Sequence, residues 1–228
     1  MGFRSTLFAM GYDRQMTKTE RAGLHARREA LLAGIRGDVL EIGAGTGLNL
    51  AIYGPEVGSL TLTEPEPPML KRLRHRTDEV VPTATVLRAP AEDLPFEDGS
   101  FDVVVSTLVL CGVSDQPRAL REIHRVLRPG GELRFLEHVR SDDPNVARKQ
   151  DRMNVVHRFV VGCECNRSTL TTITGAGFDP VHVEQATMPK APAFVRPLVI
   201  GTARCVAGRR FPTRDGGVTT SGRSGGAV

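Results

Sequence analysis

The feature that most restricts the fold is a glycine-rich turn directly after a short apolar segment. Residues 38–42 have the composition of a buried strand, and Gly43, Gly45 and Gly47 follow them, with helical sequence continuing to Tyr53. Glycines at a strand-to-helix turn let the backbone approach a ligand closely and present amide groups at a helix N-terminus. The turn therefore predicts a ligand-binding βα unit near the start of the chain.

The rest of the chain alternates between segments of strand and helix composition. Such alternation favours right-handed βαβ units and a mostly parallel sheet. We therefore expect an α/β fold, a three-layer sandwich around a doubly wound, Rossmann-like sheet with an antiparallel closing strand. The expected strands are 38–42, 59–64, 85–89, 101–107, 132–137, 181–185 and 198–206, and the expected helices are 14–35, 68–76, 116–127 and 167–175, with turns at 97–100 and 128–131.

The two ends of the chain differ from its middle. Residues 1–37 are expected to form a leader and a helix, and residues 38–207 the folded domain. From Gly208 the chain is mainly Gly, Ser, Thr and Arg, which bury too little surface to order a segment, so a disordered tail is predicted over 208–228.

Bulk composition excludes several classes of protein. A net charge of +4 is weak evidence for a nucleic-acid partner, and none is expected. No apolar stretch is long enough to span a bilayer and no secretory signal is present, so a cytoplasmic location is predicted. The four cysteines lack paired zinc-binding spacings, and Cys163 and Cys165 with His157 form an incomplete ligand set, so no metal site is expected.

Two carboxylates near the glycine turn indicate the kind of ligand. Glu41 precedes Gly43 by two residues, where its charge would repel a pyrophosphate but suits a cationic amino group. Leu48 stands where the third glycine of a dinucleotide fingerprint would be. Glu64 ends the second predicted strand, at the separation where an acid accepts from ribose hydroxyls, and Met69 follows as a candidate contact to adenine.

Four segments together resemble class I S-adenosylmethionine-dependent methyltransferases of the ubiquinone/menaquinone-biosynthesis type. They are 41–47, 91–96, 99–104 and 125–131. The resemblance implies an enzyme with S-adenosyl-L-methionine as cofactor, over which a leader containing Tyr12 and Asp13 closes. The cofactor-binding residues expected from the pattern and the resemblance are Glu41, Gly43, Ala44, Gly45, Gly47, Glu64, Pro65, Met69, Ala91, Glu92 and Thr107.

Three further segments, 107–111, 137–139 and 162–166, resemble a narrower methyltransferase-like group whose animal members are microsomal alkyl-thiol methyltransferases. This resemblance implies a small-molecule acceptor, with a thiol as the first candidate. The N-terminal hydrophobic membrane segment of the animal members has no counterpart here. His138 lies at the carboxyl end of a predicted parallel strand, where such sheets place ligand chemistry, and is the candidate catalytic base.

Two other functions remain open at this point. One keeps the methyltransferase activity and changes the acceptor to a quinol, a phenol or a lipid head group. The other is a non-catalytic protein that binds the cofactor or a nucleic acid.

Overall fold

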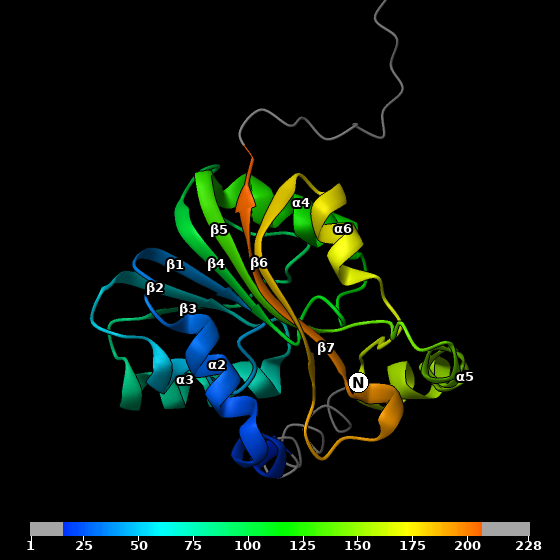
Figure 1. Cartoon of the computed structure of the whole chain (residues 1–228). Coiled ribbons are helices and arrows are strands. Elements are labelled where there is room, and N and C mark those ends of the chain that lie inside the picture. The colour runs from blue at the N-terminus through cyan, green and yellow to red at the C-terminus, as the bar shows by residue number, and fades with distance from the viewer. Residues whose placement is uncertain (1–15, 207–228) are drawn as a thin grey trace, which may run out of the picture.

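A single seven-stranded sheet forms the centre of the computed structural model, which describes residues 16–206 (Figure 1). The strand order is β3-β2-β1-β4-β5-β7-β6. The strands β1 to β5 pair in parallel, whereas β7 is antiparallel to both β5 and β6. The expected mostly parallel sheet with an antiparallel closing strand is confirmed. The strands are β1 (Gly37–Ile42), β2 (Val57–Thr63), β3 (Thr85–Leu87), β4 (Phe101–Thr107), β5 (Leu127–His138), β6 (Phe178–Thr187) and β7 (Pro197–Cys205).

Helices pack on both faces of the sheet and make a three-layer sandwich. Val104 belongs to the apolar cluster that contains Leu120 of α4 (Gln116–Val126) and Ile173 of α6 (Thr169–Gly175). The next residue, Val105, belongs to the cluster on the other face, which α2 (His25–Leu32) and α3 (Pro67–Val80) cover. Successive residues of a strand point to opposite faces, so the run of valines in β4 is buried on both sides.

The amphipathic helix α4 shows how local sequence sets these elements. Its buried residues are Gln116, Ala119, Leu120, Ile123 and Val126, which repeat at helical spacing. Asp115 caps the helix by accepting a hydrogen bond from the backbone nitrogen of Arg118 at 3.0 Å. The expected helix at 116–127 therefore differs from the observed one by a single residue.

Three local expectations are wrong. Residues 128–131 belong to β5 rather than to a separate turn, because Leu127 pairs with Phe101 while Glu132 pairs with Val103 and the residues between them bulge from the ladder. The helical stretch expected up to Tyr53 is one 3₁₀ turn, η2 (Leu50–Ile52). The helix α5 (Pro144–Val161) was not expected at all.

The N-terminal helix is part of the folded core. Residues 16–19 are helical, a π-helical segment η1 (Glu20–Leu24) follows with φ of 124° at Gly23, and α2 completes the helix. Leu24, Leu31 and Leu32 are buried in the apolar cluster on the face of the sheet that α2 and α3 cover.

The predicted leader with Tyr12 and Asp13 and the predicted tail at 208–228 lie outside the described residues. Over residues 16–206, no helix combines the length and apolar composition that crossing a bilayer requires.

Candidate functional site

The glycine turn follows β1 as expected, beside the loop that follows β4. Gly43 has φ of 55°, and a Cβ atom there would lie 2.7 Å from the side chain of Val109, so glycine is required for this contact. Gly45 also has positive φ, 59°, but a Cβ atom there would meet none of the described atoms within 4 Å. Gly43 therefore serves packing, whereas the open side of Gly45 leaves room for a ligand.

Glu41 lies at the end of β1 and is only 2% exposed. Its carboxylate accepts hydrogen bonds from Asn49 Nδ2 at 2.9 Å and from the Tyr53 hydroxyl at 2.6 Å. Burial raises the pKa of Glu41 to about 7, although both hydrogen bonds and the nearby Arg28 charge work to lower it. Asn49 and Tyr53 flank the single turn η2, which therefore presents both donors to this carboxylate.

Arg28 brings a positive charge into the same region. It lies on α2, is 2% exposed, and its Nη1 donates to Asn49 Oδ1 at 3.0 Å and to Thr107 Oγ1 at 2.9 Å. Its Nε donates to Glu20 Oε1 at 3.1 Å. Arg28 was not expected at the site. The signal for it was its position on the apolar face of the helix, four residues after Leu24.

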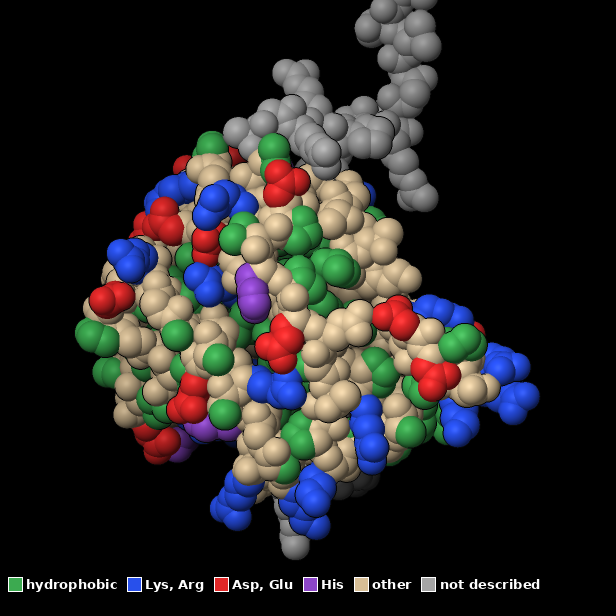
Figure 2. Space-filling model, in the orientation of Figure 1, with side chains coloured by type: hydrophobic (Ala, Val, Ile, Leu, Met, Phe, Trp, Pro, Cys, Tyr) green, Lys and Arg blue, Asp and Glu red, His purple; other side chains and the backbone are tan. Residues whose placement is uncertain are grey.

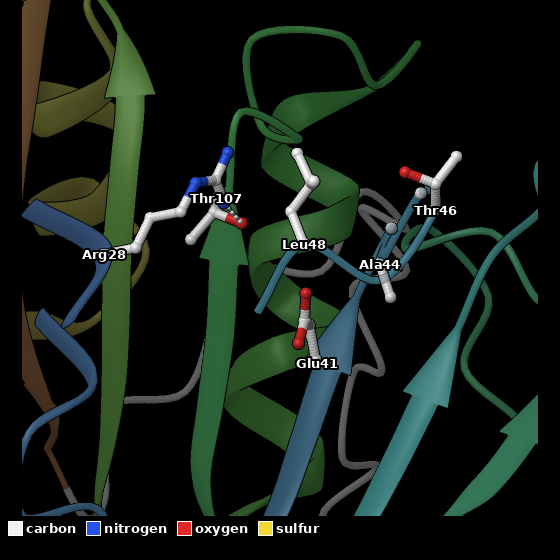
Figure 3. Close-up of a pocket in the computed structure, with 8 residues that line it drawn as sticks. Arg28, Glu41, Ala44, Thr46, Leu48 and Thr107 are labelled. Atoms are coloured by element: carbon white, nitrogen blue, oxygen red, sulfur yellow. Dashed lines mark hydrogen bonds between the residues drawn. The ribbon is translucent and has the colours of Figure 1, made fainter. Parts of the chain in front are cut away.

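Eight residues from these segments line one pocket at the carboxyl ends of β1 and β4 (Figure 3). Five of them are expected cofactor-binding residues, namely Glu41, Gly43, Ala44, Gly45 and Thr107. The other three are Arg28, Thr46 and Leu48. One wall thus carries a guanidinium and a carboxyl group beside the backbone of the glycine turn, an arrangement that complements a zwitterion.

Glu64 connects the glycine turn to the residues after β2. It is 5% exposed and accepts hydrogen bonds from the backbone nitrogens of Gly45 and Glu66, each at 2.9 Å. Burial raises the pKa of Glu64, and the two amide donors oppose that rise. Pro65 follows it, and Met69 is buried in the first turn of α3. Glu64 lies next to the pocket without lining it, so it extends the candidate site along the sheet edge.

Ala91 and Glu92 lie in the segment after β3. Ala91 is buried, and Glu92 accepts hydrogen bonds from the backbone nitrogen and hydroxyl of Ser114, each at 2.8 Å. Burial works to raise the pKa of Glu92, but the hydrogen bonds from Ser114 and Asp115 hold it below its ordinary value. Glu92 thus fixes the start of α4. Gly47 is also structural, because a Cβ atom there would lie 2.5 Å from the Leu50 side chain.

Glu137 organises the loop that follows β4. It is fully buried, and its Oε1 accepts from Ser106 Oγ at 2.7 Å and from the backbone nitrogen of Val109 at 3.1 Å. Its Oε2 accepts from the backbone nitrogen of Cys111 at 3.1 Å. Burial raises the pKa of Glu137. Because Val109 packs against Gly43, this carboxylate also supports the glycine turn.

His138 ends β5 and is 6% exposed. It does not line the pocket described above. Its Nδ1 is buried and has no hydrogen-bond partner among the described residues, whereas the backbone of Val195 and Pro197 hydrogen-bonds to the ring. Burial lowers the pKa of His138 to about 4, and the nearby His157 contributes to this shift. The ring is therefore neutral at pH 7, and its buried Nδ1 is an acceptor without a partner among the described residues.

Two of the cysteines, Cys111 and Cys163, lie close to this histidine. All four are free and buried, and hydrogen bonding to Cys163 together with burial raises the pKa of Cys111 well above its ordinary value. His157 Nδ1 lies 2.8 Å from the carbonyl oxygen of Cys163. Within residues 16–206, no three His, Cys, Asp or Glu side chains gather as a metal site would require.

Comparison with known proteins shows the family of the chain. A family model described as "Methyltransferase domain" matches residues 40–135, which include the end of β1, the glycine turn and β4. The thiol S-methyltransferase TMT1A of Homo sapiens is 34% identical over 207 residues, which are 86% of this chain and 82% of the human protein. The ubiquinone/menaquinone biosynthesis C-methyltransferase UbiE of Idiomarina loihiensis is 38% identical over 104 residues, 43% of this chain and 41% of that protein.

A solved structure shows the same fold. The S-adenosylmethionine-dependent methyltransferase from Thermotoga maritima superposes with a TM-score of 0.67, covering 90% of this chain and 99% of that one. The two sequences are 23% identical, so this likeness concerns the fold alone.

Proposed function

The chain belongs to the S-adenosylmethionine-dependent methyltransferase family that includes the thiol S-methyltransferase TMT1A, and we propose that its methyl acceptor is a small thiol. The observation that carries this proposal is the extent of the match, 207 residues at 34% identity. The match to the general methyltransferase domain ends at residue 135, so the longer match includes segments after β5, and this proposal assigns the acceptor side of the site to them.

We propose that Arg28 and Glu41 hold the amino-acid end of the cofactor. A guanidinium binds a carboxylate through a fixed fork of donors, and a buried carboxylate binds an ammonium group. The pocket provides one of each, together with the backbone of Ala44 and Gly45. The open side of Gly45 supports the fit, because an ordinary side chain there would project into the space that the ligand needs.

The remaining cofactor contacts follow the sheet edge in this proposal. Glu64 accepts from the ribose hydroxyls, beside Pro65, while Met69 and Ala91 lie against the adenine. Glu92 contributes by fixing the loop at Ser114. Thr107, held by Arg28, lines the cofactor at the end of β4.

The mechanism needs proximity, alignment and the removal of one proton. S-adenosylmethionine supplies a methyl group already activated on a sulfonium sulfur. As the acceptor sulfur forms its bond to that methyl carbon, the bond between the methyl carbon and the sulfonium sulfur breaks, and the thiol proton leaves. We propose that Nδ1 of His138 receives this proton. Because a neutral imidazole with a pKa of about 4 is a weak base, it aligns the S–H bond in the ground state and accepts the proton only as the new bond forms.

All four cysteines are free thiols, which supports a reducing, cytoplasmic location as part of this proposal. No nucleic-acid partner is proposed.

Transfer of a labelled methyl group from S-adenosylmethionine to a small apolar thiol, a phenol and a quinol tests the acceptor. The thiol should be methylated faster than the other two. Turnover of only the phenol or the quinol would overturn the thiol proposal and leave the family assignment intact.

His138→Ala tests the proton acceptor, and His182→Ala, at an exposed position of β6, is its control. The His138 variant should lose on the order of a hundredfold in turnover at pH 7, and the loss should shrink near pH 8.5, where a thiol ionises unaided. The control should keep full turnover. An equal loss at every pH would assign His138 to positioning instead.

A further inference from the structure

Two of the four free cysteines join the loop after β4 to the segment after α5. Cys111 is 1% exposed and Cys163 is 8% exposed, and their thiols are in hydrogen-bonding contact. The backbone joins the same two segments, because the nitrogen of Glu164 donates to the carbonyl oxygen of Cys111 at 2.8 Å. Neither thiol has a part in the proposed methyl transfer, so the pair is open to another role.

The positions of the two cysteines suit a disulfide bond. The Cα atom of each is two covalent bonds from an atom of that backbone hydrogen bond, and disulfides join Cα atoms about 4.4–6.8 Å apart. The two segments also pack backbone against backbone, since a Cβ atom at Gly112 would lie 3.2 Å from the carbonyl oxygen of Gly162. The thiols already point toward each other, so a small movement of one segment suffices to join them.

Cys163 is the member of the pair that a reagent meets first. It is the most exposed of the four cysteines, and Gly162 before it is exposed at the end of α5. Figures 1 and 2 show α5 standing out from the body of the molecule as a lobe, with Lys and Arg side chains at its tip.

Cys111 is suited to react second. Hydrogen bonding to Cys163, burial, and the charges of Cys163 and Glu137 raise the pKa of Cys111 well above its ordinary value. A substituent on the Cys163 sulfur removes the first of these causes, so the Cys111 thiol then ionises more readily.

We propose that Cys111 and Cys163 are a modification site for small-molecule disulfides, the oxidised form of the thiols proposed as methyl acceptors. The Cys163 sulfur attacks one sulfur of the small disulfide, breaks its S–S bond and releases the first small thiol. The Cys111 sulfur then attacks the Cys163 sulfur and releases the second. Two cysteine thiols are thereby oxidised to one disulfide, the small disulfide is reduced to two thiols, and these thiols take up the two cysteine protons.

The new bond acts on the acceptor side of the site. A disulfide is shorter than a contact between two hydrogen-bonded sulfurs, so one segment must move. The backbone nitrogen of Cys111 is held by Glu137 Oε2 at 3.1 Å, whereas the carbonyl oxygen of Cys163 lies 2.8 Å from the His157 ring. The segment at Cys163 therefore moves and carries with it His157, which lies near His138. This step rests on the proposed function, whereas the exchange reaction does not.

Treatment of the full chain with hydroxyethyl disulfide, followed by thiol titration and peptide mapping, tests the exchange independently of the methyl acceptor. Wild type should lose two of its four thiols and yield a peptide in which Cys111 is joined to Cys163. Cys111→Ala should retain hydroxyethyl thiol on Cys163, because the second attack is absent. Cys205→Ala is the matched control, since Cys205 is a buried thiol of β7, and it should form the same disulfide as wild type.

Two results of the mapping would overturn the proposal. One is a wild type that keeps all four thiols under these conditions. The other is a disulfide between Cys163 and Cys165, which is also buried and near Cys163.

Methylation kinetics test the effect on the acceptor side. The oxidised wild type should methylate a small thiol with an initial rate lower by about tenfold or more, followed by a lag in which the thiol reduces the disulfide. Its affinity for S-adenosylhomocysteine should be unchanged. Disulfide-treated Cys205→Ala should show the same lag, and wild type treated with dithiothreitol should show none.

An oxidised wild type that starts at full rate would overturn the effect on the acceptor side. If the untreated protein methylates no thiol at all, the proposed acceptor is wrong, while a mapped bond between Cys111 and Cys163 still supports the modification site.

Discussion

Arg28 Nη1 donates a hydrogen bond to Thr107 Oγ1 at 2.9 Å, and this contact joins the N-terminal helix to the end of β4 across 79 positions of sequence. The same nitrogen reaches Asn49, which also donates to Glu41. The helix thus supplies one wall of the pocket at the carboxyl ends of β1 and β4. A segment that is separate in sequence from the glycine turn becomes part of the same binding site.

This contact predicts a specific stability effect. Arg28→Met should lower the free energy of unfolding by about 3 kcal/mol, because it leaves the carboxylate of Glu20 and the side chain of Asn49 without a buried donor. Arg27→Met is the control, since Arg27 is on the same helix and, among residues 16–206, its one ion pair is with an exposed Glu184 at 3.4 Å. Urea unfolding should show little change for the control. Equal losses in both variants would mean that the buried contacts of Arg28 contribute nothing specific.

Substitutions at two glycines distinguish the effect of backbone strain from the effect of blocking the ligand. Gly45 and Gly99 have φ of 59° and 64°, and a Cβ atom at either would meet none of the described atoms within 4 Å. Alanine at each position should therefore lower stability by about 1 kcal/mol through strain alone. Only Gly45→Ala should also weaken binding of S-adenosylhomocysteine in calorimetry, because Gly45 lines the pocket. Retained affinity in that variant would place the ligand elsewhere.

Glu41 predicts opposite effects of pH on stability and on binding. Its pKa is about 7 in the folded protein, above the ordinary value of 4.5, so the fold favours the protonated form. The stability that this preference provides is present below pH 4.5 and is lost as pH rises to 7, by about 3 kcal/mol. Glu41→Gln removes this titration, so wild type should lose stability relative to the variant between pH 4.5 and pH 7.

Cofactor binding should follow the opposite course in the same pH range. The ionised carboxylate pairs with the cofactor's ammonium group, so wild-type affinity should rise through pH 7. In Glu41→Gln the affinity should be weaker and should lack this rise. Thermal unfolding and calorimetry at matched pH values measure both quantities, and parallel pH profiles of wild type and variant would contradict the assignment.

Glu137 predicts a local effect on the loop after β4. Glu137→Ala leaves the buried amides of Val109 and Cys111 without an acceptor, which should cost on the order of 3 kcal/mol. Hydrogen exchange should quicken at these amides first. Glu132→Ala is the control on the same strand, because Glu132 pairs with Arg134 and Arg204 near the surface. Unchanged exchange at the two amides in Glu137→Ala would contradict the role assigned to this carboxylate.

The parts of the molecule that local sequence determines were predictable. The glycine turn, Glu41 and the buried strand at 101–107 each depend on neighbouring residues, and the structure has them where the pattern indicated. Arg28 was missed because its role depends on where the N-terminal helix packs, which its own sequence leaves open. Glu137 has no role in the sequence analysis, since its partners belong to the loop after another strand, β4.

The helix α5 was missed for a different physical reason. Helices are recognised by an apolar stripe that faces the core, but α5 turns Gln150 and His157 inward and Val155 and Phe159 outward. The spacing of apolar residues along α5 therefore does not mark a face that packs against the core, and the helix has no core-facing apolar stripe by which to predict it. For residues 128–131 the local sequence predicted a feature that the structure lacks. A Pro-Gly-Gly sequence is typical of a turn between two elements, but here it forms a bulge inside β5.

The most direct test of the central claim compares two ligands that differ only at the amino-acid end. S-adenosylhomocysteine has the ammonium and carboxylate groups assigned to Glu41 and Arg28, whereas 5′-methylthioadenosine lacks both. Calorimetry of wild type and Arg28→Lys should show that the variant binds S-adenosylhomocysteine about tenfold or more weakly, because the guanidinium fork is lost, while its affinity for 5′-methylthioadenosine is unchanged. Equal losses for the two ligands, or no loss for either, would contradict the account.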